Sequence, residues 1–76
     1  MKAYVLINAI TGQNPQVVRD LRRIKHIATA DLTFGPYDIV AVVEAEDLAA
    51  IGRVVTEDVQ STPGVQKTLT CLQIPI

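Results

Sequence analysis

Residues 38–45 read Asp-Ile-Val-Ala-Val-Val-Glu-Ala, a β-branched block that would be apolar on both faces of a strand. A strand with two apolar faces is typical of the centre of a sheet that is covered on both sides. Residues 3–9 have the same character, because the run from Tyr4 to Ile7 is wholly apolar and rich in strand formers. We therefore predict two central strands, over residues 3–9 and 38–45.

Two further segments alternate in polarity, which is the pattern of a strand with one buried face. In residues 27–34, Ala28, Ala30 and Leu32 alternate with Thr29, Asp31 and Thr33 until Gly35-Pro36 ends the segment. In residues 65–74, Thr68, Thr70, Leu72 and Ile74 lie on one side, and Leu69 and Cys71 lie on the other. Both segments are expected to be strands.

Helical periodicity separates these strands in two places. The first helix is expected to take Asn14 as its N-cap and Pro15 as its first residue, and to end near Arg23. Its inward residues would be Val17 or Val18, Leu21 and Ile24. The second helix would begin after Glu46 and Asp47, whose charge suits a helix N-terminus, and would end near Ser61. Its predicted buried stripe consists of Leu48, Ile51, Val55 and Val59.

The resulting order is βαββαβ, in which a strand, a helix and a strand occur twice. Right-handed crossovers then place a strand of each half between the two strands of the other. We expect a single α+β, ferredoxin-like domain over residues 1–76, with a four-stranded antiparallel sheet and both helices on one face. Because two helices cover only one face, the other face must be buried by a second chain. This predicts an obligate dimer, a sandwich packed sheet against sheet.

Composition excludes several classes of function. Seven basic and eight acidic side chains give a formal charge of −1, so the basic footprint of a nucleic-acid-binding protein is missing. No run approaches the roughly 18 apolar residues of a membrane span, and no cleavage pattern follows the apolar N-terminal segment. We expect a soluble cytoplasmic protein. One cysteine, Cys71, and one histidine, His26, allow no intramolecular disulfide and argue against a metal cluster.

No side chain indicates catalysis, and no cofactor or metal is expected, so we predict that the protein is not an enzyme. His26 follows a basic helix end, and Cys71 has the apolar neighbours of a small buried residue. A strand end and a helix start account for Glu44, Glu46 and Asp47. The basic cluster contains Arg19, Arg22, Arg23 and Lys25, and a solvated helix face or a subunit contact explains it better than an anion site.

The connection Phe34-Gly35-Pro36-Tyr37-Asp38 has two interpretations. It could be only a turn, with glycine for an unusual backbone angle and proline for a fixed φ. Alternatively, Tyr37 places a ring with a polar tip beside the carboxylate of Asp38 and the bare backbone of Gly35. That combination suits a ligand that carries an ammonium and a carboxylate group.

At these residues the chain resembles the ligand-binding (RAM) domain of Lrp/AsnC-type transcriptional regulators. The resemblance covers essentially the whole chain and rests on three segments, Ala3 to Ile7, Gly35 to Val40, and Pro63-Gly64-Val65 with Thr68-Leu69-Thr70. It implies the same βαββαβ sandwich, homodimers that assemble into a higher oligomer such as an octameric ring, and an amino-acid effector bound between dimers. It also implies effector contacts from Gly35, Tyr37, Asp38, Thr68 and Thr70, with Asp38 on the effector's amino group.

The family's regulators begin with a helix-turn-helix DNA reader, whereas this sequence starts directly at its first strand, so no DNA-binding domain is expected. The module would then sense an effector and act on a full-length relative by mixed assembly, or form an independent oligomer. Two alternatives stay open. One is an enzyme of the dimeric α+β barrel class, such as a monooxygenase or isomerase, and the other is a purely structural oligomerisation module.

Overall fold

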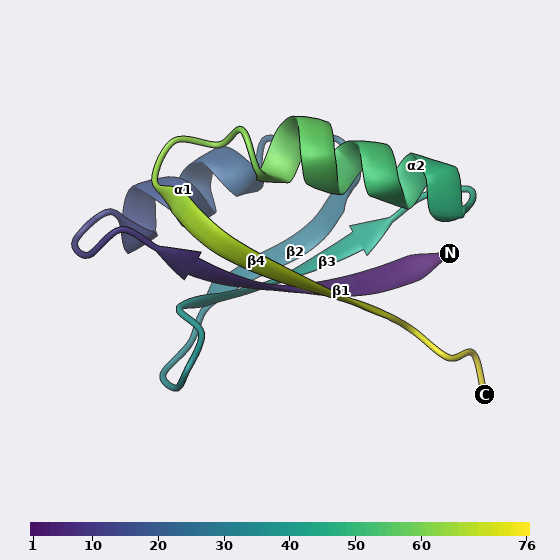
Figure 1. Cartoon of the computed structure of the whole chain (residues 1–76), viewed down its shortest axis with the longest axis horizontal. Coiled ribbons are helices and arrows are strands. Elements are labelled where there is room, and N and C mark those ends of the chain that lie inside the picture. Colours follow the sequence, from purple (N-terminus) through teal and green to yellow (C-terminus); the bar gives the residue numbers. More distant parts are fainter.

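The computed structural model describes residues 1–76. It contains a four-stranded antiparallel sheet with the helices packed on one face (Figure 1). The elements are β1 (Lys2–Ala9), α1 (Asn14–Leu21), β2 (Ile27–Leu32), β3 (Ile39–Glu44), α2 (Leu48–Arg53), the π-helical η1 (Val54–Val59) that continues α2, and β4 (Val65–Leu72). The strand order is β2-β3-β1-β4. This confirms the predicted ferredoxin-like fold and the central position of β1 and β3.

The core lies between the sheet and the helices. It consists of sixteen buried apolar residues, and all the inward residues of the two central strands belong to it. These are Ala3, Val5, Ile7 and Ala9 of β1 and Ile39, Ala41 and Val43 of β3. The helices contribute Val17, Val18, Leu21, Ile51, Val54, Val55 and Val59. The one buried polar residue is Thr62, whose hydroxyl donates to the Asp58 carbonyl at 2.8 Å.

The start of α1 differs from the prediction. Gln13 is the cap residue and Asn14 is already helical, so the assignment of Asn14 as N-cap was wrong. No side chain caps this end of the helix, and Pro15 in the first turn needs no backbone hydrogen bond there. At α2, by contrast, Asp47 is the N-cap and its carboxylate accepts from the Ala50 backbone N–H at 2.8 Å. The expected negative charge at that helix start is confirmed.

The second helix changes type at its middle, and its buried face differs from the prediction at two residues. Leu48, which we expected to be buried, is 56% exposed, whereas Val54 is 4% exposed and joins the core. From Val54 onward the helix is π-helical, and a backbone bond there spans five residues, as from the Gln60 N–H to the Val55 carbonyl at 2.9 Å. Val54 and Val55 follow the buried Ile51 by three and four residues, which is the spacing of one helix face, so all three belong to the core.

Strand β2 does not alternate as predicted. Its pairing with β3 shifts register between Ile27 and Thr29, and the extra residue of this bulge, Ala28, is exposed. Leu32 is exposed too, at the end of an edge strand beside an open depression that Pro15 also lines. Only Ile27 and Ala30 of β2 reach the core.

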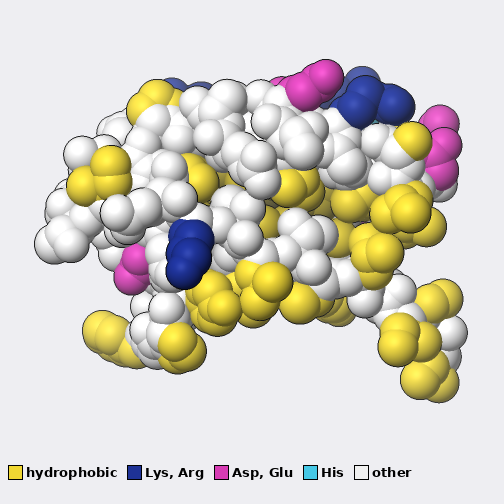
Figure 2. All heavy atoms as spheres, in the orientation of Figure 1, with side chains coloured by type: hydrophobic (Ala, Val, Ile, Leu, Met, Phe, Trp, Pro, Cys, Tyr) yellow, Lys and Arg dark blue, Asp and Glu magenta, His cyan; other side chains and the backbone are white.

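The sheet face opposite the helices, which we call the open face, is apolar at its centre. In the strand register Tyr4 lies opposite Val42 and Cys71, and Leu6 lies opposite Val40 and Leu69. Figure 2 shows hydrophobic side chains along the underside of the sheet, and the β2–β3 loop and the C-terminal tail project below it. Cys71 is exposed on this face, so its expected burial within the chain was wrong. None of the helices has the length and apolar character that a membrane crossing requires.

Candidate functional site

The β2–β3 loop and the start of β4 meet at one end of β1. On one side of β1, the Asp38 backbone N–H donates to the Ile7 carbonyl at 2.9 Å. On the other side, the register places Thr68 opposite Ile7 and Lys67 opposite Asn8. Both segments that the sequence analysis selected, residues 35–38 and 68–70, are therefore brought to the same β-strand.

Asp38 has a structural contact within the chain. Its carboxylate Oδ2 accepts a hydrogen bond from the Ala9 backbone N–H at 2.8 Å, in a half-buried position. Ala9 is the last residue of β1, next to the register shift in the pairing of β1 with β4. The Asp38 side chain thus ties the start of β3 to the end of β1. The other carboxylate oxygen, Oδ1, accepts no hydrogen bond from the chain.

The loop before Asp38 is organised by Thr33. Its hydroxyl donates to the Tyr37 carbonyl at 2.7 Å, and its backbone N–H donates to the Asp38 carbonyl at 2.9 Å. Gly35 has a φ of +141°, which side chains rarely adopt, so the turn requires a glycine. The space around a Cβ at this position would be open. Gly35 therefore shapes the tip of the loop.

A depression of about 240 Å³ lies where the loop faces β4. Its lining residues are Asn8, Pro36, Tyr37, Lys67, Thr68 and Leu69; we call this depression the loop–β4 pocket. Of the five predicted site residues, the pocket brings together Tyr37 and Thr68. Gly35, Asp38 and Thr70 do not line it.

The two threonines have different surroundings. The Thr68 hydroxyl accepts from the Gln60 side-chain amide at 3.2 Å, so the end of η1 holds it in place. Thr70 lies opposite the inward-facing Val5 and yet is exposed, because the helices do not cover the outer strand there.

Sequence reasoning missed Asn8 and Lys67. Asn8 is a polar interruption near the end of the apolar β1, Lys67 is the one charged residue of β4, and a correct antiparallel register of the two strands would have paired them.

Two other depressions are lined by none of the predicted site residues. The larger, about 840 Å³, lies at the opposite end of β1 and is lined in part by Lys2, His26 and Glu44. The other, about 490 Å³, lies beside the start of α1. No three His, Cys, Asp or Glu residues are close enough together to hold a metal ion.

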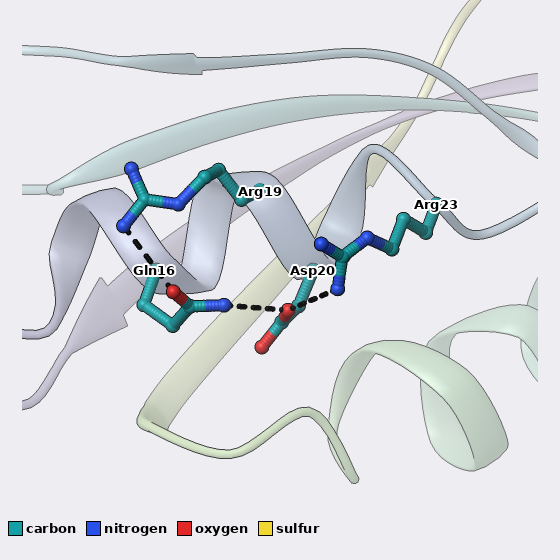
Figure 3. A network of polar contacts seen from close by, with 4 residues as sticks. All are labelled: Gln16, Arg19, Asp20 and Arg23. Carbon is teal, nitrogen blue, oxygen red and sulfur yellow. Dashed lines mark hydrogen bonds and ion pairs between the residues drawn. The ribbon is translucent and has the colours of Figure 1, made fainter.

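Arg19 of α1 and the two arginines that directly follow the helix are engaged within the chain. Arg19 donates to the Gln16 side chain at 3.2 Å, and Arg23 pairs with Asp20 at 3.2 Å (Figure 3). Just past the helix end, Arg22 donates to the Ala30 carbonyl at 2.9 Å and lies 3.5 Å from the Asp31 carboxylate. Three of the four basic residues of this cluster therefore have partners in the chain, which agrees with a solvated helix face.

Comparison with known proteins gives a consistent result. The family model of the Lrp/AsnC ligand binding domain matches residues 2–74, whereas no curated protein matches significantly. The solved structure of TTHA0845 from Thermus thermophilus is 29% identical, with a TM-score of 0.92, and the match covers 99% of this chain and 94% of that one.

Two larger transcription regulators share the fold. AsnC of E. coli is 24% identical with a TM-score of 0.87, and the match covers 99% of this chain and 52% of AsnC. The regulator NMB0573 of Neisseria meningitidis, solved as a complex with L-Met, is 14% identical with a TM-score of 0.84 over 97% of this chain and 49% of the regulator. The 76 residues thus correspond to about half of each regulator.

Proposed function

The chain belongs to the family of Lrp/AsnC ligand-binding domains, and we propose that it binds an amino acid as its effector and assembles with copies of itself, without catalysing a reaction. The observation that carries the proposal is the loop–β4 pocket, because it unites Tyr37 with Thr68 from two distant segments of the sequence. Residues from separate elements that converge on one concave site are characteristic of small-molecule binding.

Size and chemistry support an amino acid as the effector. The pocket, at about 240 Å³, is smaller than the roughly 300–1,000 Å³ typical of drug-sized ligands. Pro36 and Leu69 provide apolar walls, and hydroxyl, amide and ammonium groups provide polar contacts. The Neisseria regulator, which shares this fold, was solved with L-Met.

The proposed contacts use the pocket residues and also Asp38, which lies outside the pocket lining but is next to Tyr37 in the sequence. The unoccupied Oδ1 of Asp38 would accept from the effector's amino group, and Tyr37 would enclose the effector. Gly35 shapes the loop that presents both residues. Thr68 would donate a hydrogen bond to the effector while it accepts one from Gln60. Thr70 is exposed outside the pocket. Its hydroxyl would form a hydrogen bond with the effector or a contact with another subunit.

Assembly is proposed to begin with a homodimer formed through the open face. Besides Leu69, which lines the loop–β4 pocket, the face carries five apolar residues in register across three strands, namely Tyr4, Leu6, Val40, Val42 and Cys71. Continuous exposed apolar surface is a typical mark of a protein interface. In a two-fold dimer that packs these faces together, the same apolar surface of each copy would be buried against that of the other. Further assembly of dimers, and mixed assembly with a full-length regulator, would connect binding to transcription.

The alternative enzymatic role finds no support in the core. Barrel enzymes of the dimeric α+β class need polar groups in a cavity between sheet and helices. Here, of the seventeen buried residues, the only polar one is Thr62, and it bonds to the backbone. The region in which such chemistry would occur is filled with aliphatic side chains.

A thermal-shift panel of the twenty amino acids tests the proposal. An amino acid present at ten times its Kd adds about 1.4 kcal/mol to the free energy of unfolding. For a domain of this size that gain raises the midpoint by roughly 6–11 °C. The D-enantiomer of each positive chiral amino acid is the matched control. A flat panel at millimolar concentrations would contradict effector binding and would favour the purely structural module.

A further inference from the structure

We propose that Lys67 binds the carboxylate of the effector, so that the pocket selects amino acids over the corresponding amides and amines. This inference rests on the proposed function and adds the group that recognises the second charge of the amino acid. It starts from the composition of the pocket. Lys67 is the one charged residue among the six that line it.

The Lys67 ammonium is free to bind a ligand. It takes part in no hydrogen bond or ion pair of the chain, unlike Arg22 and Arg23, which pair with aspartates. The Asp38 carboxylate, which belongs to the same end of the sheet, is directed at the Ala9 backbone. An anionic ligand would therefore not have to displace an existing partner of Lys67.

The backbone around Lys67 is well fixed. The residue belongs to β4 and is paired with Asn8 at the last position before the register shift of β1. Its neighbour Thr68 is hydrogen-bonded to Gln60 of the preceding helix end. Because strand positions hold binding groups more precisely than loops do, the backbone of Lys67 is fixed beside the pocket, and its flexible stem carries the ammonium to the ligand.

The remaining polar groups suit a carboxylate. Three of the lining residues, Asn8, Tyr37 and Thr68, carry an N–H or O–H donor, and a carboxylate offers about four acceptor sites. An α-amino acid would thus place its carboxylate on Lys67, its ammonium toward Asp38 and an apolar side chain against Pro36 and Leu69. The inferred ligand class is an α-amino acid with an apolar side chain and a free carboxylate.

The test compares each amino acid that is positive in the panel with its own carboxamide, by calorimetric titration of the full chain. Charge-assisted hydrogen bonds are about twice as strong as neutral ones, and the lysine is exposed. We therefore expect the acid to bind about tenfold more tightly than the amide. Lys67→Met should remove this preference, and Lys67→Arg should keep it. Lys25→Met is the matched control, because Lys25 is exposed and borders no depression.

Three results would overturn the inference. If Lys67→Met still prefers the acid tenfold, another group binds the carboxylate. If Lys67→Met weakens acid and amide equally, Lys67 contributes packing and not charge. In both cases the proposed function stands, because the wild-type chain binds an amino acid. If none of the twenty amino acids binds the wild-type chain, the proposed function fails and this inference fails with it.

Discussion

Replacing Asp38 by alanine and, separately, by asparagine distinguishes the two roles that we assign to its carboxylate. The structural role is the 2.8 Å bond from the Ala9 N–H to Oδ2. A hydrogen bond to a charged acceptor contributes about 1.5–3 kcal/mol, and a half-buried N–H without a partner costs about as much. Asp38→Ala should therefore destabilise the chain by about 2–3 kcal/mol. Asparagine offers an amide oxygen at the same position, so Asp38→Asn should cost about 1 kcal/mol.

The effector role depends on charge and not on shape. Asp38→Asn keeps an oxygen but removes the negative charge proposed to face the effector's ammonium group. We expect its amino-acid affinity to fall about tenfold or more, although its fold is nearly as stable as wild type. An alanine variant alone would not separate these effects, because a loosened end of β1 also disturbs Asn8, which lines the pocket.

Urea unfolding at one fixed protein concentration measures the first effect, since dimer formation would make stability depend on concentration. Calorimetric titration with the amino acid found in the panel measures the second. An asparagine variant as unstable as the alanine variant would refute the structural argument. An asparagine variant that binds as tightly as wild type would remove Asp38 from the effector site.

Two further outcomes are expected. Leu6→Lys places a charge in the middle of the open face and should convert dimers to monomers in sedimentation velocity. Thr56→Lys, on the exposed side of η1, should leave the dimer intact, and monomeric wild type would contradict the proposed dimer. Gly64→Ala should cost about 2–5 kcal/mol, against about 1–2 for Gly12→Ala, as measured by urea unfolding. Both glycines have positive φ, but only a Cβ at Gly64 would lie 2.8 Å from the buried Val17 side chain. Equal losses would show that this close approach has no energetic consequence.

The sequence allowed the fold to be predicted where a pattern had a single physical cause. Apolar residues on both faces of β1 and β3 could be explained only by central strands, and the structure places them there. Predictions failed where local geometry departed from the ideal period. A bulge left Ala28 exposed, and such an extra residue has no clear sequence signature. Leu48, the first residue of α2, is exposed although its spacing from Ile51 fits the buried stripe.

The candidate site was predicted only in part. Tyr37 and Thr68 were selected from the sequence, and they share a pocket because both flank the same end of β1. Lys67 and Asn8 were missed, because their role depends on a cross-strand register that residue types alone do not fix. The bond between Asp38 and Ala9 joins residues 29 positions apart and was equally invisible in the sequence.

The strand order β2-β3-β1-β4 has a consequence for how the chain folds. Residues before the β2–β3 loop supply β1 and β2, and residues after it supply β3 and β4, so every pair of neighbouring strands joins the two sides of the loop. A fragment cut at this loop would contain two strands and no partner for either, and it would have no sheet of its own. Two of the three pairings, β1–β3 and β1–β4, join residues far apart in the sequence, and long-range pairings of this kind slow folding. The same interleaving would allow two chains to exchange these segments by opening a single loop, the one that holds Gly35 and Tyr37.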